Sequence, residues 1–443
     1  MKLKTSPGGA AHPETEMVGI VLLILLFLLA IGLPVAAALG SLGFAVDALF
    51  STMPLGRALG EIAWTSSNGF LLLSIPLYVM LGELLLRSGM ADRMYEGMST
   101  WLSWLPGGLM HSNIGACAAF AATCGSSAAT AATIATVAIP QAEKHGYSQR
   151  LFLGSLASGG TLGILIPPSI NMIIYGALTD TSIPKLYLAG IVPGLLLAGL
   201  FMLTVLIACV LKPSMGGTRL KYSWGSRLQG LLDLLPALAI FLVIVISIYG
   251  GFATATESAA LGLMMALVLA AMRKRLSVAM FLQVFEGTVR TTSMIMLIIV
   301  AAFFLNFVLG GVGVTGKVSA FVTSLQLSPY ELLLAVVVFY IVIGCFMETL
   351  SIMVTTLPFV VPLMVQAGFD PVWFGIVFII LIEMALITPP VGLNLYVIQG
   401  VRRGGSVADV MIGSLPFALA MLFLIGLLSI WPSIAMFMPN MAG

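Results

Sequence analysis

Long apolar runs alternate with short polar connections along almost the whole chain. A helix needs about 20 mostly apolar residues to cross a bilayer. This criterion predicts crossing helices over eight continuous runs. They are residues 17–33, 34–50, 70–86 and 186–211 in the first half, and 231–250, 254–272, 289–309 and 410–435 in the second.

Two further apolar runs contain adjacent prolines. Residues 151–178 hold Pro167 and Pro168, with several glycines just before them, and residues 373–398 hold Pro389 and Pro390. A proline inside a helix removes a backbone hydrogen bond and clashes with the preceding turn. Broken backbone is tolerated in a membrane only where protein or a water-filled cavity satisfies it. Both runs are therefore predicted to be helices that break at membrane depth.

Two more segments are predicted to be re-entrant helical hairpins. Residues 109–140 are rich in Ala, Gly, Ser and Thr and are interrupted at Cys124–Ser127, so that each arm is too short to cross. Residues 330–365 are similarly interrupted near Gly344–Thr349. Each hairpin is expected to return to the side of the membrane from which it enters.

One offset relates the two halves of the chain. Pro167 and Pro168 precede Pro389 and Pro390 by 222 residues, and further pairs share this offset without a gap. This predicts an internal duplication, with repeats at residues 1–211 and 230–443 joined by a polar linker over 212–229. The further pairs are Gly40 and Gly262, Gly89 and Gly311, Pro140 and Pro362, and Gly146-Tyr147 and Gly368-Phe369.

The basic residues predict an orientation for the repeats. Each half has five expected spans, and an odd number makes the second half enter the membrane inverted. If the linker is cytoplasmic, 14 of the 19 basic residues lie inside, as the positive-inside rule prefers. The inside residues are Arg87, Arg93, Lys144, Arg150, Lys212, Arg219, Lys221, Arg227, Arg273, Lys274, Arg275, Arg290, Arg402 and Arg403; Lys2, Lys4, Arg57, Lys185 and Lys317 lie outside.

Composition agrees with an all-α polytopic membrane protein. The 443 residues are 60% hydrophobic and 8% charged, against roughly 25% charged residues in soluble domains. The sparse basic residues give no indication of nucleic-acid binding. The four cysteines lie in apolar segments without the spacing of a disulfide framework or a metal site. Lys2 and Lys4 before an apolar run resemble a signal peptide, but the run's counterpart in the second repeat argues against cleavage.

Inverted repeats with broken helices are typical of secondary transporters, whose site lies near the midplane between the repeats. The two hairpin tips and the two breaks are therefore expected to converge. Unwound carbonyls and hydroxyls are hard ligands suited to sodium, and helix N-termini favour an anionic substrate. The predicted pocket residues are Gly125, Ser126, Ser127, Gly163, Pro167, Ser169, Asn171, Glu348, Thr349, Thr388, Pro389 and Asn394, of which Ser126, Ser127, Gly163, Glu348, Thr349 and Thr388 are the predicted sodium ligands.

Packing is the alternative explanation for part of this pattern, because small residues such as those of Gly125–Thr133 also line tight helix contacts in membranes. Intramembrane acids are functional candidates by default. Glu348, at the second tip, is the best candidate for an ion or gating role, and Glu383 could orient the second break. Glu257 can instead cap a helix, and Glu83 can pair with Arg87 four residues later.

The chain resembles the large membrane subunit of tripartite ATP-independent periplasmic (TRAP) transporters over nearly its whole length. The resemblance implies a sodium-driven importer of organic acids in the bacterial inner membrane, with an elevator mechanism and a fold similar to divalent-anion sodium symporters. It also implies a small four-helix membrane subunit and a soluble periplasmic substrate-binding protein as partners. The stretches that carry it are Ile75–Arg93, Leu105–Asn113, Gly125–Ile134, Gly159–Ile170, Gly344–Ile352 and Gly368–Val397.

Two positions depart from the family's pattern. Glu348 stands where the family commonly has Asp, and Ala385 where it often has Gly. Both lie beside the expected second sodium site and put its geometry in question. Since no extra four-helix segment fits in this length, the small subunit is expected to be a separate protein.

Three other functions are compared with that of a subunit in a three-component importer. A stand-alone sodium or proton symporter of the same fold would need no binding protein. An intramembrane enzyme would need a nucleophile and base, or metal ligands, at membrane depth, and no such pair of residues is found. A channel fits less well, because broken-helix sites favour occlusion over an open pore. Neither the substrate nor the oligomeric state can be determined from the sequence.

Overall fold

The computed structural model describes residues 13–218, 220–345, 347–402 and 404–442. Within these residues the regular structure is helical, apart from an isolated bridge between Tyr147 and Gly216. The all-α prediction is thus confirmed. Four basic residues used to predict the orientation, Lys2, Lys4, Arg219 and Arg403, lie outside the described residues.

The described residues of the first half, from Pro13 on, fold into ten α-helices. They are α1 (Pro13–Ala30), α2 (Val35–Phe50), α3 (Leu59–Ser67), α4 (Ser74–Arg87), α5 (Met90–Leu102), α6 (Leu109–Cys124), α7 (Ser127–His145), α8 (Gln149–Leu165), α9 (Ile170–Thr179) and α10 (Ile183–Leu211).

The second half begins at Trp224, inside the segment expected to be a linker. Its helices are α11 (Trp224–Tyr249), α12 (Ala255–Met272), α13 (Val278–Gly311), α14 (Val314–Ser324), α15 (Pro329–Gly344), α16 (Thr349–Gln366), α17 (Pro371–Ala385), α18 (Leu393–Val401), α19 (Val407–Ile430) and α20 (Ser433–Ala442). The expected span over 289–309 is the later part of α13, which starts 11 residues earlier, at Val278.

Interruptions of the helices fall where the two halves correspond. Helices α6 and α7 meet at Gly125-Ser126, and α15 and α16 meet between Gly344 and Thr349. Helix α8 gives way to α9 around Pro167-Pro168, and α17 to α18 around Pro389-Pro390. Each tip and each break therefore ends one helix and starts another, which exposes carbonyl groups on one side and N–H groups on the other.

Helices α5 and α14 were not assigned from the sequence. Each follows a glycine in the left-handed region, Gly89 with φ +71° and Gly313 with φ +75°. Helix α5 carries charged and polar residues on one face, so a search for continuous apolar runs misses it. The two helices occupy corresponding places in the two halves, after α4 and α13.

Seven helices among the described residues are long and apolar enough to cross a membrane, and the bent pair α8 and α9 makes eight. Six of the seven coincide with expected spans: Phe70–Arg87, α10, α11, α12, α13 and α19. The seventh is α16, which was expected to be a hairpin arm. Helices α2, α15 and α17 are apolar but shorter.

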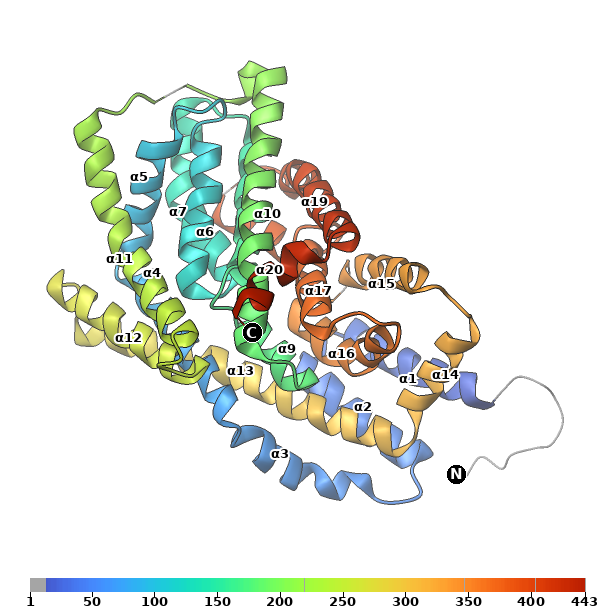
Figure 1. Cartoon of the computed structure of the whole chain (residues 1–443). Coiled ribbons are helices and arrows are strands. Elements are labelled where there is room, and N and C mark those ends of the chain that lie inside the picture. Colours follow the sequence, from blue (N-terminus) through green and yellow to red (C-terminus); the bar gives the residue numbers. More distant parts are fainter. Residues whose placement is uncertain (1–12, 219, 346, 403, 443) are drawn as a thin grey trace.

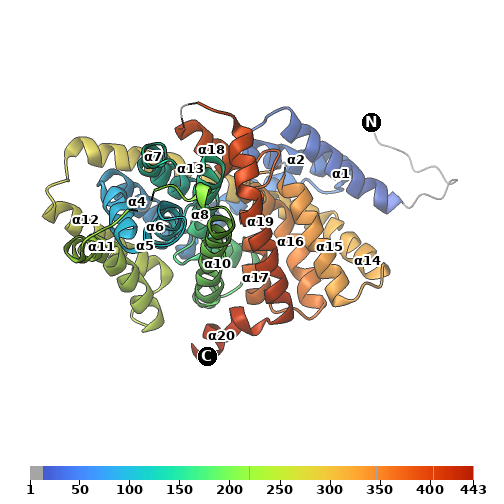
Figure 2. The same cartoon turned by 90° about the horizontal axis from the view of Figure 1, so that it is seen from above.

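The two halves interlock around their broken helices. Helix α8 packs along α19 of the second half, and α17 packs along α10 of the first. Likewise, α7 packs against α18, and α16 against α9. Both views show α6 and α7 (cyan) and α15 and α16 (orange) on opposite sides of α10 and α19 (Figure 1, Figure 2). The hairpins thus approach one central region from opposite sides.

Candidate functional site

The two tips and the two breaks meet at a cavity of about 250 Å³. The first residues of four helices line it: Ser127 of α7, Ile170 of α9, Thr349 of α16 and Leu393 of α18. The first N–H groups of a helix have no partner within the helix, and the helix dipole places partial positive charge there. Four such ends around one cavity make a favourable environment for an anion.

A second wall of the cavity comes from α4 and α13. It contains Gly82 and Glu83 of α4 and Thr291 of α13. Gly82 lies against the first tip, since a Cβ atom placed on it would be 2.9 Å from Sγ of Cys124. The cavity is therefore enclosed by the hairpins and broken helices on one side and by two continuous helices on the other.

The first tip is held by its own hydroxyl and by a close contact with α8. Ser126 caps α7, and its Oγ accepts a hydrogen bond from the N–H of Ala129 at 3.5 Å. A Cβ atom on Gly163 would lie 3.1 Å from the carbonyl oxygen of Ser126, so this glycine lets α8 approach the tip. Gly163 thus lies behind the tip and does not line the cavity.

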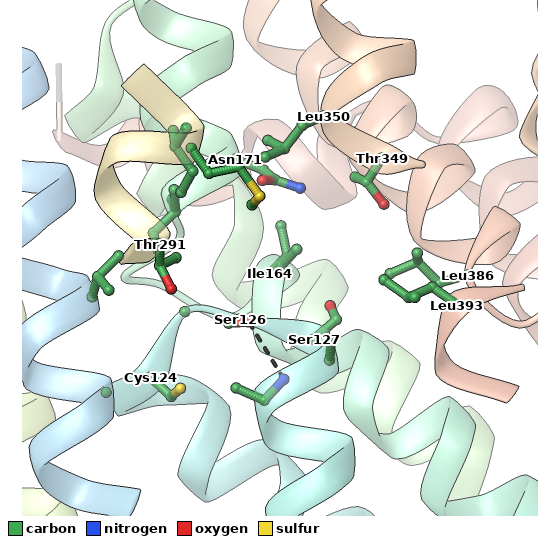
Figure 3. Close-up of a pocket in the computed structure, with 18 of the residues that line it drawn as sticks. Cys124, Ser126, Ser127, Ile164, Asn171, Thr291, Thr349, Leu350, Leu386 and Leu393 are labelled. Atoms are coloured by element: carbon green, nitrogen blue, oxygen red, sulfur yellow. Dashed lines mark hydrogen bonds between the residues drawn. The ribbon is translucent and has the colours of Figure 1, made fainter. Parts of the chain in front are cut away.

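Buried polar groups point into the cavity without a partner. Asn171 and Thr349 are each 4% exposed, and within the described chain Nδ2 of Asn171 and Oγ1 of Thr349 lack hydrogen bonds. Figure 3 shows these two side chains with Leu350 on one side of the cavity and Ser126 and Ser127 on the other. Burying an unpaired polar group is costly, so these atoms are suited to bind a polar ligand.

Glu348 caps α16 at the second tip. Its Oε2 accepts hydrogen bonds from the N–H of Leu350 at 3.1 Å, the N–H of Ser351 at 3.3 Å and the Oγ of Ser351 at 3.4 Å. The side chain is exposed and borders the cavity. A glutamate therefore serves here as the N-cap, and one of its carboxylate oxygens is already occupied by the helix.

Six of the twelve predicted pocket residues line the cavity, namely Gly125, Ser126, Ser127, Asn171, Glu348 and Thr349. The other six are not part of the lining. Ser169 caps α9 by accepting from the N–H of Met172 at 3.3 Å, and Thr388 donates to the carbonyl oxygen of Met384 at 2.7 Å. Pro167 is buried and Pro389 is partly exposed.

Asn394 ties the second break to the first repeat. Its side chain is fully buried, and its Nδ2 donates to the carbonyl oxygen of Ala157 in α8 at 3.1 Å. It also lies close to Gly160, because a Cβ atom there would be 3.2 Å from this Nδ2. Asn394 was predicted as a pocket residue, but it lies outside the cavity lining and anchors the second break to α8.

Glu383 lies next to the site, although the sequence predicted for it only a role in orienting the second break. Glu383 of α17 is 1% exposed, and Oγ of Ser127 donates a hydrogen bond to its Oε2. The other expected pairings of acids are present: Nε of Arg87 lies 3.1 Å from Oε2 of Glu83, and Glu257 completes a capping box with Thr254. The sequence signal for Glu383 was its position in an apolar run, one turn before a break.

The charged residues that line the cavity, among those described, are Glu83 and Glu348; no Lys, Arg or His is among them. Other lining residues are aliphatic, including Val79, Ile164 and Leu386. An anion in this cavity would therefore depend on helix N-termini, buried amide and hydroxyl groups and any cation that binds with it.

Comparison with known proteins gives consistent matches along the chain. The family model described as "Tripartite ATP-independent periplasmic transporter, DctM component" matches residues 22–434. The C4-dicarboxylate TRAP transporter large permease protein DctM of Pseudomonas aeruginosa is 34% identical over 390 residues, covering 87% of this chain and 90% of that protein. The isethionate TRAP transporter permease protein DctMQ of Oleidesulfovibrio alaskensis is 30% identical, covering 92% of this chain and 64% of that longer protein.

A solved structure shares the fold. The YdaH transporter of Alcanivorax borkumensis, described as having an unusual topology, superposes with a TM-score of 0.63 at 18% identity. The match covers 96% of this chain and 98% of that protein. The two proteins therefore share the arrangement of their helices over nearly their whole lengths.

Proposed function

Because the chain belongs to the DctM component family of TRAP transporters, it is a large permease subunit, and we propose that it imports organic acid anions by sodium symport. The observation that carries the proposal is the meeting of four helix N-termini at one cavity whose charged lining residues, among those described, are both acidic. The named relatives handle C4-dicarboxylates and isethionate, which are organic acid anions.

Sodium coupling follows from the balance of charge. Helix N-termini attract an anion, but Glu348 repels it, whereas the charge of Glu83 is already offset by Arg87. A cation that binds at the same time offsets this repulsion and makes the anion's binding depend on it. Sodium suits the available donors, which are backbone carbonyls at helix C-termini and the hydroxyls of Ser127 and Thr349. Substrate and sodium would thus be bound together.

We assign the sodium ligands to the two tips and their supports. Ser126 and Ser127 would act at the first tip, with the carbonyl region around Gly163, and Glu348 and Thr349 would act at the second, with Thr388. The hydroxyl of Thr388 donates to its own helix, which leaves its oxygen lone pairs available to a cation. The donors are hard oxygens throughout, as this ion requires.

The two-walled cavity supports an elevator mechanism. The hairpins and broken helices would form the mobile part, because α7 with α18 and α16 with α9 pack as interlocked pairs. Helices α4 and α13 would belong to the static part, and they pack against each other beside the cavity. Sliding of the mobile part along this wall would carry substrate and sodium across the membrane together.

The partners follow from the family. We propose that the protein works in the bacterial inner membrane with a small four-helix subunit and a soluble periplasmic substrate-binding protein. The DctMQ relative is a longer protein of which this chain matches 64%, and its name joins the large and small components. The soluble protein would deliver the organic acid to the outward-facing cavity. No nucleic acid takes part.

The test is uptake of a labelled organic acid by proteoliposomes that contain all three components. Uptake should require an inward sodium gradient and should be lost when potassium replaces sodium. The variants Ser126→Ala, Glu348→Gln and Thr388→Ala should each raise the sodium concentration needed for half-maximal uptake. Full uptake without a sodium gradient would refute the coupling. Full uptake by the large subunit alone would instead favour a stand-alone symporter.

A further inference from the structure

An ion pair lies in the wall of the cavity that α4 and α13 form. Nε of Arg87 lies 3.1 Å from Oε2 of Glu83, which is one turn earlier in α4. Nη1 of Arg87 also donates to Oε1 of Gln283 in α13 at 3.0 Å. Glu83 lines the cavity, whereas Arg87 does not. The pair is thus fixed to both helices of this wall.

The carboxylate of Glu83 rests on the backbone of α13. A Cβ atom on Gly287 would lie 2.6 Å from Cδ and Oε2 of Glu83, so a larger residue there would displace the carboxylate. Gln283, Gly287 and Thr291 follow one another at intervals of four residues and therefore share one face of α13. Thr291 lines the cavity (Figure 3). The carboxylate is therefore seated about one helical turn along α13 from a lining residue.

The second half has two leucines at the corresponding positions. The 222-residue offset relates Glu83 to Leu305 and Arg87 to Leu309, both in the later part of α13. The two leucines are buried, at 3% and 4% exposed. Apolar side chains of similar volume can often replace an ion pair without loss of stability, so packing alone does not require charges at these positions. This points to a role for the charges themselves.

That role concerns the electrostatic potential in the cavity. The carboxylate of Glu83 alone would repel an anion there, whereas the guanidinium of Arg87 alone would attract one. Paired, the two groups largely cancel each other's effect on the ligand. The energy of a dianion in a given potential is twice that of a monoanion. Any change in the balance of the pair therefore alters the preference of the cavity between the two kinds of anion.

We propose that Glu83 and Arg87 form a specificity-determining pair, whose balance of charge sets how strongly the cavity distinguishes dianions from monoanions. Glu83 acts on the cavity directly. Arg87 is a positioning residue, which holds the carboxylate of Glu83 against α13 and neutralises it. The inference rests on the proposed transport of organic acid anions and adds a determinant that lies outside the tips and the breaks.

Two thiol reagents of opposite charge can measure this potential whatever the substrate is. Cys124 lines the cavity, and mass spectrometry of the full-length protein gives its rates of modification by anionic sulfonatoethyl methanethiosulfonate and cationic trimethylammonioethyl methanethiosulfonate. Arg87→Gln should lower the ratio of the anionic to the cationic rate by about tenfold, because a factor of about three for each unit of charge acts twice. Glu83→Gln should raise the ratio by about tenfold, and the double variant should restore it.

Arg93→Gln is the matched control, because it makes the same change in an ion pair, with Asp233, that does not line this cavity. It should leave the ratio unchanged, and Arg87→Lys, which keeps the charge, should do the same. Should Arg87→Gln fail to fold, Glu83→Gln decides alone, because damage to the fold would not produce faster reaction with the anionic reagent only. Unchanged ratios in the folded Glu83 and Arg87 variants would overturn the inference.

Uptake by proteoliposomes that contain all three components separates this inference from the proposed function. Labelled succinate serves as the dianion and labelled isethionate as the monoanion. In Arg87→Gln, KM should rise about tenfold for succinate and about threefold for isethionate, with kcat unchanged. Wild-type uptake with the same KM ratio in all variants would overturn the inference alone. Wild-type protein that takes up neither anion in a sodium gradient would contradict the proposed function, and the labelling ratios would still test the pair.

Discussion

The contact between the first tip and the first break can be tested with two glycines that share one backbone conformation. Gly125 follows α6 with φ +64°, and Gly146 follows α7 with φ +68°. Alanine in this left-handed region costs about 1–2 kcal/mol at either position. The surroundings differ: a Cβ atom on Gly125 would lie 3.0 Å from the carbonyl oxygen of Pro168, whereas nothing lies within 4 Å of one on Gly146.

Gly125→Ala should therefore destabilise the protein more than Gly146→Ala. Both variants carry the backbone cost, and crowding against Pro168 adds about 1–3 kcal/mol to the first. Displacing the tip by a few tenths of an ångström should also lower the apparent sodium affinity of Gly125→Ala alone.

Thermal unfolding of the purified variants, with and without sodium, measures both effects. Gly146→Ala provides the reference for backbone strain without a neighbour. Equal unfolding temperatures and equal sodium responses for the two variants would refute the reasoning, because the stability of the tip would then not depend on its contact with Pro168.

Three further predictions concern the cavity and its supports. A maleimide should modify Cys124, which lines the cavity, more slowly when substrate and sodium are present, and Cys117, 0% exposed, should stay unmodified in mass spectra. Asn394→Leu should lower the free energy of unfolding by about 1–3 kcal/mol, measured by thermal unfolding, because Ala157 loses its buried donor. Arg150→Gln should cost less than about 1 kcal/mol in the same assay, because the ion pair with Asp409 is partly exposed; a larger loss would mean that this pair does more than a surface contact.

The sequence was sufficient to predict the places where helices are interrupted. Proline pairs and glycine-rich tips leave helical hydrogen bonds unmade, so they identify helix ends whatever surrounds them. Gly125, Ser126 and Ser127 were predicted from such an interruption, and they line the cavity. Asn171 and Thr349 follow the same logic, because each lies in the first turn of a helix that begins at a break or a tip.

The rest depends on contacts between distant segments. Gly163 and Thr388 do not line the cavity: Gly163 packs against the backbone of Ser126, and the hydroxyl of Thr388 donates to its own helix. The hydrogen bond between Ser127 and Glu383 joins residues 256 positions apart. Helices α5 and α14 were not predicted, because a helix with one polar face has no continuous apolar run.

The predicted duplication offers a reason why one cavity would bind a cation and an anion together, as proposed. In both halves, one helix ends and another starts at each tip and each break. Free carbonyl groups and free N–H groups therefore lie near one another around the cavity. The side chains have diverged within this frame: the 222-residue offset relates Thr161 to Glu383 and Ser126 to Glu348. At these paired positions the carboxyl groups are those of the second half, Glu348 and Glu383, whereas Glu83 of the first half borders the cavity from α4. If sodium binds at both tips, as proposed, this difference in charge predicts different sodium affinities there, so that the two tips would fill in order as sodium rises.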